Sequence, residues 1–497
     1  MISIYKVTIF VNNVTSRIGF PTQSNKGVQD YIENQLMQEL SFKQKGYQYT
    51  SAYRSGKWDG RTYLYNPHYH TFPTGLLQRV IHTLQINQVQ VQVEDQRTRP
   101  IDMEEALERW KNLSLHGITL RDYQREAILS AITEERGILD MSTGSGKTEV
   151  AAGIIATLQV KTLFIVHLRT LLFQSAKRIS ERLGCRVAVF GSGSYQWGDI
   201  TVASIQSLYR NLENLLPHLK EVQLVIVDEA HHISNNTYFK VLKNTGAYYR
   251  FGLSGTPLDR SDCSSLITVG MLGEVIHKTT SSELIRRDLL TKPTIIFIPI
   301  SEEDAFPQGN ENYFEWREVY EAGIVYNNYR NTAIARIVQK LLQKGKKHIL
   351  VFVKEVRHGE CLENLFREYG LHAPLLWSTT SKFELSQKLE RFRKGEISVL
   401  ISSPIFDEGI DIPEVDAIVL AGGGESTIKT IQRIGRGVRK SHNKQNLVVI
   451  DFFDQHHYIL KRHSQSRIKA CKREKEFQVI DPQEESHERR RTVSEPV

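Results

Sequence analysis

The chain has 497 residues, of which 40% are hydrophobic and 24% are charged, proportions that are ordinary for a globular protein with several domains. No stretch approaches the apolar length of a membrane span, and residues 1–10 alternate like a strand rather than a signal peptide. We therefore expect a cytoplasmic protein without membrane contact. Four scattered cysteines argue against disulfides and zinc, and the net charge of +8 suggests a polyanionic partner such as nucleic acid.

Residues 1–98 are predicted to form a small α+β domain that stands apart from the rest of the chain. The patterns predict a strand over Ile4–Val11, a helix over 28–40, strands around Tyr47–Tyr53 and Tyr63–Tyr65, a helix over Gly75–Ile86 and a strand over Gln88–Glu94. The Asp59-Gly60 pair indicates a hairpin turn.

A basic and aromatic cluster flanks this turn, with Trp58 among Arg54, Lys57 and Arg61. An indole beside cations can stack on an unpaired base while the cations meet phosphates. An equally weighted alternative is that Trp58 covers the core of its own domain and that the charges are solvated.

A glycine-rich loop dominates residues 118–291, which follow a linking helix predicted at 99–117. Apolar residues end a strand before the loop, and a helical pattern follows it, so backbone N–H groups and the helix N-terminus can hold phosphates. The loop residues assigned to the nucleotide are Thr143, Gly144, Ser145, Gly146, Lys147 and Thr148. Lys147 would contact the phosphates of ATP and Thr148 would bind Mg²⁺. Met141 stands where such loops usually begin with glycine.

Two positions upstream of the loop are also assigned to the nucleotide. Gln124 lies about twenty residues before the loop, and its amide can hydrogen-bond an adenine edge. Arg121, in the same stretch, is the second candidate. Glutamine on a helix is otherwise most often a surface residue.

Strands alternate with helices beyond the loop, which predicts a parallel sheet with ligands at the carboxyl ends of its strands. Arg169, Ser204 and Gln206 lie at such ends, and Arg169 and Gln206 are candidate nucleic-acid contacts. The apolar run 224–227 ends in Asp228-Glu229. Two carboxylates at the end of a buried strand are costly without a cation, so Asp228 is predicted near Mg²⁺ and Glu229 beside the attacking water.

Residues 292–455 show a second strand–helix alternation without a phosphate loop. The aromatic segment 313–329 is interpreted as a helix packing into the groove between domains in preference to a base-stacking platform. Arg436 and Arg439 are three residues apart, so at a helix start both can project from one face towards ATP and neutralise charge on its γ-phosphoryl group. A plain basic helix is the alternative.

Six motifs in order resemble those of the superfamily 2 (DEAH-box-like) helicases: Gln124, Ser142–Thr148, Asp228–His231, Ser254–Thr256, Asp407–Asp411 and Gln432–Arg439. The N-terminal Gly56–Arg61 and Pro73–Leu77 are similar to the branched-DNA helicases of phages. The resemblance implies two tandem RecA-like domains closing on ATP and Mg²⁺, with Gly409 and Asp411 near the nucleotide. Ser403 would contact nucleic acid, although a serine pair, Ser402-Ser403, stands where many relatives carry threonine.

The sequence thus predicts an ATP-dependent DNA helicase or translocase that acts as a monomer on single-stranded, forked or branched DNA, in the host cytoplasm if phage-encoded. RNA–DNA hybrids are a further candidate substrate. Residues 456–497 are predicted to be a basic, partly flexible tail. A double-strand translocase subunit of a restriction or remodelling complex and a non-enzymatic nucleic-acid-binding module are the alternatives.

Overall fold

The computed structural model describes residues 5–21, 26–44, 46–233, 236–255, 265–301, 315–377, 380–403, 412–440 and 446–484. They belong to two compact units. The first unit combines Met1–Ser142 with Gly146–Thr279, and the second combines Thr143–Ser145 with Thr280–Val497. The division at Thr279 differs from the predicted boundary at residue 291, because Ser282 donates its backbone N–H and its hydroxyl to Glu474 of the second unit (3.0 and 2.7 Å).

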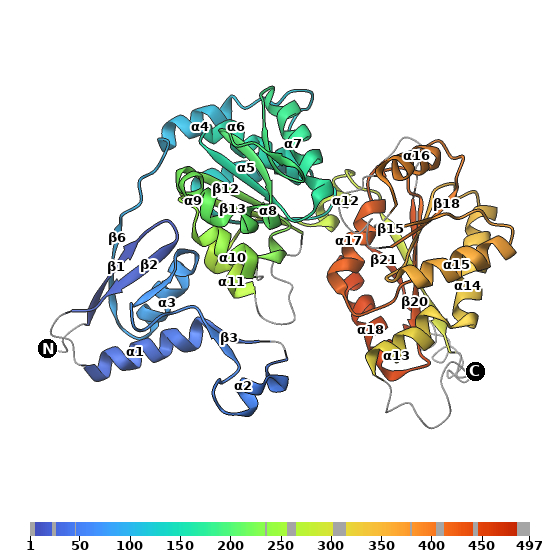
Figure 1. The fold of residues 1–497 in the computed structure, drawn as a ribbon, viewed down its shortest axis with the longest axis horizontal. Helices are drawn as coiled ribbons and strands as arrows, with labels where there is room; N and C mark the ends of the chain where they lie inside the picture. Colours follow the sequence, from blue (N-terminus) through green and yellow to red (C-terminus); the bar gives the residue numbers. More distant parts are fainter. Residues whose placement is uncertain are drawn as a thin grey trace, which may run out of the picture. The chain divides into compact units, whose positions relative to one another are not determined.

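The N-terminal part of the first unit is the predicted α+β fold. Its four-stranded sheet has the order β5-β2-β1-β6 (Figure 1). The elements are β1 (Lys6–Val11), β2 (Thr15–Gly19), α1 (Lys26–Glu39), β5 (Thr71–Pro73), η2 (Thr74–Leu76), α3 (Leu77–Ile86) and β6 (Gln90–Asp95). Ile32 and Leu36 of α1 are buried, as the spacing predicts.

This N-terminal part does not stand apart from the following domain, contrary to the prediction. Its core is continuous with that of the first RecA-like domain. A Cβ on Gly75 would lie 2.0 Å from the Val269 carbonyl oxygen, and Arg79 forms an ion pair with Glu274 (2.6 Å). Glycine is required at position 75 because the two backbones meet there.

A small arm extends from the N-terminal sheet. It consists of β3 (Ser41–Lys43), η1 (Tyr47–Tyr49), α2 (Ser51–Arg54) and β4 (Arg61–Tyr63), with β3 and β4 paired antiparallel (Figure 1). The prediction of a strand at Tyr47–Tyr53 is wrong. The Thr50 side chain accepts a hydrogen bond from the Tyr53 backbone N–H and caps a short helix there.

The remainder of the first unit is an eight-stranded sheet with the order β10-β9-β11-β8-β12-β13-β7-β14, parallel except for β10. Its strands are β7 (Arg136–Met141), β8 (Thr162–Val166), β9 (Ala188–Gly191), β10 (Ser194–Tyr195), β11 (Ile200–Ser204), β12 (Leu224–Asp228), β13 (Tyr249–Ser254) and β14 (Val275–Thr279). The helices are α4 (Met103–Lys111), α5 (Asp122–Glu134), α6 (Lys147–Leu158), α7 (Arg169–Leu183), α8 (Ile205–Arg210), α9 (Leu212–Glu221), η3 (Ala230–His232), α10 (Asn236–Lys243) and α11 (Ser265–Leu272).

The second unit contains a seven-stranded parallel sheet with the order β17-β18-β16-β19-β20-β15-β21. Its strands are β15 (Pro293–Ile300), β16 (Ile349–Phe352), β17 (Leu375–Leu376), β18 (Val399–Ser402), β19 (Ala417–Leu420), β20 (Leu447–Asp454) and β21 (Gln478–Ile480). The helices are α12 (Ser281–Arg286), α13 (Trp316–Tyr320), the π-helical η4 (Glu321–Val325), α14 (Asn328–Gln343), α15 (Val356–Glu368), α16 (Lys382–Arg393), α17 (Thr427–Gly437) and α18 (Tyr458–Arg473). The two RecA-like sheets are therefore confirmed.

Residues 458–480 are part of the second unit, which corrects the prediction of a tail from residue 456. The strand β21 pairs with β15, and α18 buries Leu460, Ile468 and Cys471. Arg467 of α18 is 3% exposed and donates to both oxygens of the fully buried Asp451 carboxylate (2.9 and 3.0 Å). The basic residues of this stretch fit either a helix facing DNA or a solvated helix, and neither interpretation predicts that Arg467 lies in the core.

None of the helices in the described part of the chain combines the length and apolar character that a membrane crossing needs. The described cysteines, Cys185, Cys361 and Cys471, are free.

The Arg467–Asp451 pair predicts a stability defect. Arg467→Met leaves Asp451 charged and buried, which should lower the free energy of unfolding by about 3–5 kcal/mol, measured by denaturant titration. Lys469→Met, which removes an exposed charge from the same helix, should change it by less than about 0.5 kcal/mol. Equal effects of the two variants would contradict the role of the buried pair.

Candidate nucleotide site and nucleic-acid contacts

The predicted phosphate loop connects β7 to α6. Gly144 and Gly146 have φ of 86° and 84°, a conformation that residues with a side chain rarely adopt. A Cβ on Gly146 would lie 2.3 Å from Nε2 of Gln124, so the loop also requires glycine for space. Lys147 and Thr148 follow as the first two residues of α6. Their position at a helix N-terminus fits phosphate binding.

Gln124 lies against this loop from α5. Its side-chain oxygen accepts a hydrogen bond from the Arg121 backbone N–H (3.0 Å), and the residue is 6% exposed. The helix cap therefore fixes the amide orientation and places Nε2 beside Gly146. The assignment of Gln124 and Arg121 to adenine stays a prediction.

The two predicted carboxylates lie together at the end of β12. Glu229 has a φ of 50°, unusual for a residue with a side chain, and its carboxylate is 3.3 Å from Nζ of Lys147. Burial and the neighbouring Glu229 raise the pKa of Asp228 to about 6. A buried carboxyl with a raised pKa, held beside a second carboxylate, is a site that a divalent cation would stabilise.

Mg²⁺-ATP fits this set of residues, with Thr148 and Asp228 as the protein groups that would hold the metal. Among the described residues, no group of three or more His, Cys, Asp or Glu side chains could bind a metal ion by itself. The metal would therefore share its coordination with the phosphates and neutralise their charge.

A group of histidines next to the carboxylates was not predicted. The rings of His167, His232 and His231 stack in series, with centroid distances of 4.3 and 4.2 Å. His231 Nδ1 lies 3.0 Å from Oγ of Ser254, whose hydroxyl donates to Glu229 (3.5 Å). The group connects the carboxylates to the loop before α7. His231 and His232 are adjacent in the chain but His167 is distant from them, so the sequence gives no pattern that would indicate this stack.

The candidate nucleic-acid contacts of the first unit lie where they were predicted. Arg169 and Gln206 begin α7 and α8, at the carboxyl ends of the adjacent parallel strands β8 and β11. Both are exposed, and Gln206 Nε2 donates to the His167 carbonyl (2.9 Å). Ser204 instead caps α8. Contact of Arg169 and Gln206 with nucleic acid stays a prediction.

In the second unit, Arg436 lies in the last turn of α17 and Arg439 lies beyond its end, in a bridge with Leu290. The prediction that both project from one face at a helix start is therefore wrong, and their role towards ATP stays a prediction. Ser403 is 3% exposed, which gives no support to a contact with nucleic acid. Gly409, Asp411 and Thr256 lie outside the described residues.

On the N-terminal arm, Trp58 is half-buried and donates its indole N–H to the Arg61 carbonyl (2.7 Å). Arg54 and Lys57 are exposed. Tyr49, which the sequence did not single out, is 78% exposed. The half-buried position of Trp58 supports its role in the packing of the arm, while Tyr49 presents the accessible ring.

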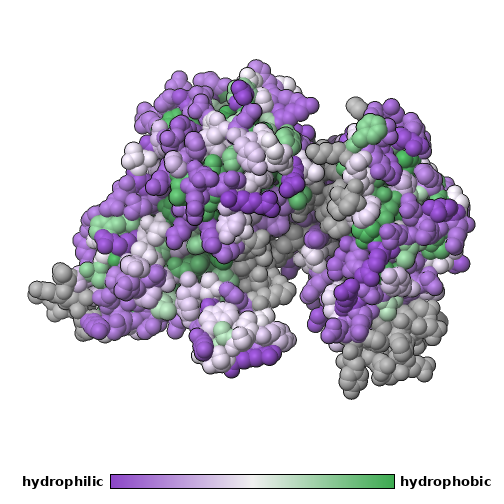
Figure 2. Space-filling view, in the orientation of Figure 1, coloured by the Kyte–Doolittle hydropathy of each residue, from purple (hydrophilic) through white to green (hydrophobic). Residues whose placement is uncertain are grey.

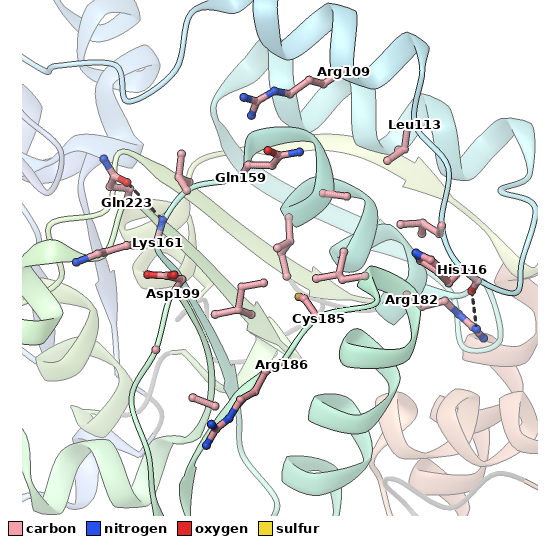
Figure 3. A pocket seen from close by; sticks show the side chains of 18 of the residues that line it. Arg109, Leu113, His116, Gln159, Lys161, Arg182, Cys185, Arg186, Asp199 and Gln223 are labelled. Atoms are coloured by element: carbon pink, nitrogen blue, oxygen red, sulfur yellow. Dashed lines mark hydrogen bonds between the residues drawn. The ribbon is translucent and has the colours of Figure 1, made fainter.

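A cavity of about 1110 Å³ opens at the amino ends of β8 and β11, the opposite edge of the sheet from the phosphate loop (Figure 3). Its cations already have partners. Arg109 donates to the Leu158 carbonyl (3.4 Å), Lys161 pairs with Glu221 (2.7 Å) and Arg182 donates to the His116 carbonyl (3.1 Å). These partners are the carbonyl at the end of α6, a loop carbonyl and a carboxylate, and the cavity lies away from the phosphate loop, so it is not the candidate nucleotide site.

Comparisons with known proteins agree with this geometry. Residues 117–259 match the family "Type III restriction enzyme, res subunit", and residues 332–441 match "Helicase conserved C-terminal domain". The chain is 27% identical to "DNA 3'-5' translocase XPB2" of Sulfurisphaera tokodaii, over 67% of this chain and 81% of that protein. It is 25% identical to "ATP-dependent DNA helicase uvsW" of Enterobacteria phage T4, over 85% of this chain and 86% of that protein. Its fold is similar to that of the "ATP-dependent Type ISP restriction-modification enzyme LlaBIII bound to DNA" (TM-score 0.56, 17% identity, 72% of this chain and 30% of that one).

The raised pKa of Asp228 predicts a pH-dependent effect on stability. Its pKa in the fold, about 6, lies above the usual 3.8, so its ionisation above pH 6 destabilises the fold. Without Mg²⁺ and nucleotide, Asp228→Asn should raise the free energy of unfolding at pH 8 by about 1–3 kcal/mol, and the gain should disappear as the pH falls through 6 towards 4. Thermal unfolding across this pH range measures it.

Asp199→Asn, at an exposed position, serves as the control and should show no such pattern. A stability of Asp228→Asn equal to that of the unsubstituted chain at pH 8 would contradict the buried, ionised carboxylate.

Proposed function

Because the chain belongs to the superfamily 2 helicases and is an ATP-dependent enzyme of that class, we propose that it unwinds or branch-migrates branched DNA, such as forks and four-way junctions. The observation that carries the proposal is the extent of the similarity to the phage T4 DNA helicase. The similarity covers 85% of this chain, which is a larger share than residues 118–455 make up. The similarity therefore extends beyond the motor into parts that could select the substrate.

The ATPase part of the proposal rests on Lys147, Thr148, Asp228 and Glu229. Lys147 would hold the phosphates, Thr148 and Asp228 would hold Mg²⁺, and Glu229 would orient the attacking water. Arg436 and Arg439 would neutralise the charge that develops on the γ-phosphoryl group. ATP turnover would then drive movement along one strand, with Arg169 and Gln206 among the strand contacts.

Substrate selection is assigned to the N-terminal arm. Tyr49 presents an exposed ring on the same arm as the exposed cations Arg54 and Lys57, and Arg54 donates to the carbonyl of Gln48, the residue before Tyr49 (3.2 Å). This combination suits stacking on an unpaired base with phosphates alongside. Trp58 keeps the turn in place through its hydrogen bond to Arg61. The N-terminal sheet that carries the arm shares a continuous core with the ATP-binding domain, and Phe42 of the arm belongs to that core, so an arm held at a branch point would move together with this domain.

A double-strand translocase is the second candidate, favoured by the match to the restriction-enzyme subunit family. Such a motor would hydrolyse ATP on duplex DNA without separating strands. The two functions are distinguished by ATP turnover and strand displacement on single-stranded, duplex, forked, four-way and RNA–DNA substrates. Strand separation on forked or four-way DNA supports the proposal, and duplex-stimulated turnover without it supports the translocase.

The arm gives a sharper prediction. Tyr49→Ala should weaken binding to four-way and forked DNA by about tenfold or more, because a stacking contact contributes about 1–3 kcal/mol. ATP turnover stimulated by single strands should be kept. Trp58→Ala should cause a similar loss together with a lower melting temperature.

Tyr195→Ala, which removes an exposed ring (66%) from the first RecA-like domain, is the matched control. Unchanged junction affinity for Tyr49→Ala, measured by fluorescence anisotropy, would remove the arm from the proposal.

A further inference from the structure

A second pocket, of about 470 Å³, lies wholly within the second unit. It is lined by Lys354 beyond β16, by the glycine turn Gly423–Ser426 beyond β19, by the first turn of α17, and by residues of α13 and α18. β16 and β19 are adjacent parallel strands, so the pocket opens at the carboxyl edge of this sheet. Trp316, Arg462 and His463 lie outside residues 332–441, so part of the pocket is not contained in the matched helicase domain.

Three buried side chains bind the carbonyl groups of the glycine turn and fix its backbone. Arg330 donates to the Ala421 carbonyl (2.6 Å), Tyr320 to Gly422 (2.8 Å) and Arg467 to Gly424 (2.6 Å). Gly423 and Gly424 have φ of 55° and 95°, and within the described part of the chain neither donates its backbone N–H to another group. A Cβ on Gly424 would meet nothing within 4 Å. The turn therefore presents backbone N–H donors, as anion-binding turns do.

Lys354 is the main cation of the pocket. Its ammonium lies over the rings of Tyr320 and Trp316, 4.4 and 5.3 Å from their centroids. It forms no ion pair or hydrogen bond with any described residue. Partial burial lowers the pKa of Lys354 from its usual value. Lys354 is exposed, and an ammonium that has no carboxylate partner among the described residues can bind an anionic ligand at the pocket.

The pocket also contains a buried histidine and a helix N-terminus. His463 is 5% exposed and its Nδ1 has no partner among the described residues, while Nε2 lies 3.6 Å from the rim carboxylate of Glu425. Burial lowers the pKa of His463 to about 4. α17 begins at the pocket with Ser426 as its cap. Its first turn adds partial positive charge.

The cations extend from the pocket to the surface. Lys429 and Arg462 line its mouth and are exposed, and hydrophilic residues cover the visible surface over α18 (Figure 2). Trp316 is 36% exposed beside them. In the larger cavity of the first unit, Arg109 and Arg182 donate to backbone carbonyls and Lys161 pairs with a carboxylate, whereas Lys354 has no such partner among the described residues. A row of cations with an aromatic ring at its side suits a polyphosphate chain better than a single small anion.

We infer that this pocket binds a phosphodiester group of the nucleic-acid strand, with Lys354, the Gly423–Gly424 N–H groups and the N-terminus of α17 around the phosphate. The inference rests on the proposed function, since it assigns part of the strand's path across the second unit. Lys429 and Arg462 contact the neighbouring phosphates, and Trp316 borders an adjacent sugar or base.

The test is the salt dependence of DNA binding by the full chain, measured by fluorescence anisotropy with a forked DNA at several KCl concentrations. Each phosphate contact contributes about 0.7–0.9 to the slope of log K against log salt. Lys354→Met should lower the slope by about that amount, and adding Arg462→Ala should lower it further. Lys354→Arg, which keeps the charge, should retain most of the slope.

Lys344→Met is the matched control. It removes the same charge from an exposed position at the end of α14, before β16 and thus at the opposite edge of the same sheet. An unchanged slope for Lys354→Met, or equal losses in Lys354→Met and Lys344→Met, overturns the inference. Thermal unfolding of each variant confirms that it is folded, and methionine keeps an unbranched side chain beside the rings of Tyr320 and Trp316.

Two further outcomes are separable. If inorganic phosphate alone raises the melting temperature and Lys354→Met abolishes this rise while the DNA slope is unchanged, the pocket binds a free anion and the inference is overturned. If the unsubstituted chain neither binds forked DNA nor hydrolyses ATP faster in its presence, the proposed function fails. If the unsubstituted chain binds forked DNA and hydrolyses ATP faster in its presence, but Lys354→Met keeps the salt slope, only the inference about the pocket is overturned.

Discussion

The burial of Asp228 beside Glu229, at the end of a fully parallel stretch of sheet, is the constraint on which the nucleotide site depends. Two carboxylates there repel each other, and Nζ of Lys147 lies 3.3 Å from the Glu229 carboxylate. The charge of these two carboxylates therefore requires that a metal site, a lysine and the glycine loop lie together at one strand end. The raised pKa of Asp228 reflects the cost of this arrangement without a metal ion.

In the second unit, two buried arginines hold the glycine turn beyond β19. Arg330 and Arg467 are almost fully buried, and each is paired with an aspartate at the end or within β20. Their remaining donors hold the carbonyls of the turn beyond β19. Because the carbonyls are fixed inward, the turn keeps its N–H groups for an external partner. The buried pairs thus stabilise the fold and shape the proposed phosphate pocket together.

Much of the nucleotide site was predictable because its chemistry is local. A strand, a glycine loop and Lys-Thr are consecutive residues, and Asp228-Glu229 directly follow an apolar run. The alternation of strands and helices likewise predicted both parallel sheets. The failures involve contacts distant in sequence or local capping. The Thr50 side chain caps a helix where a strand was predicted. Close backbone packing at Gly75 joins the N-terminal sheet to α11. The packing of the helix at 458–473 against the second sheet was not predictable, because nothing in the sequence distinguishes Arg467 from a surface arginine until Asp451 is placed beside it.

The central claim is that the end of β12 carries the ATPase centre that drives strand separation. The most direct test compares Glu229→Gln with the unsubstituted chain in ATP binding, ATP turnover and unwinding of forked DNA, with Glu221→Gln at an exposed position as the control. We expect Glu229→Gln to bind ATP while its turnover falls about 100-fold or more and unwinding is lost with it. Turnover near that of the unsubstituted chain would contradict the account.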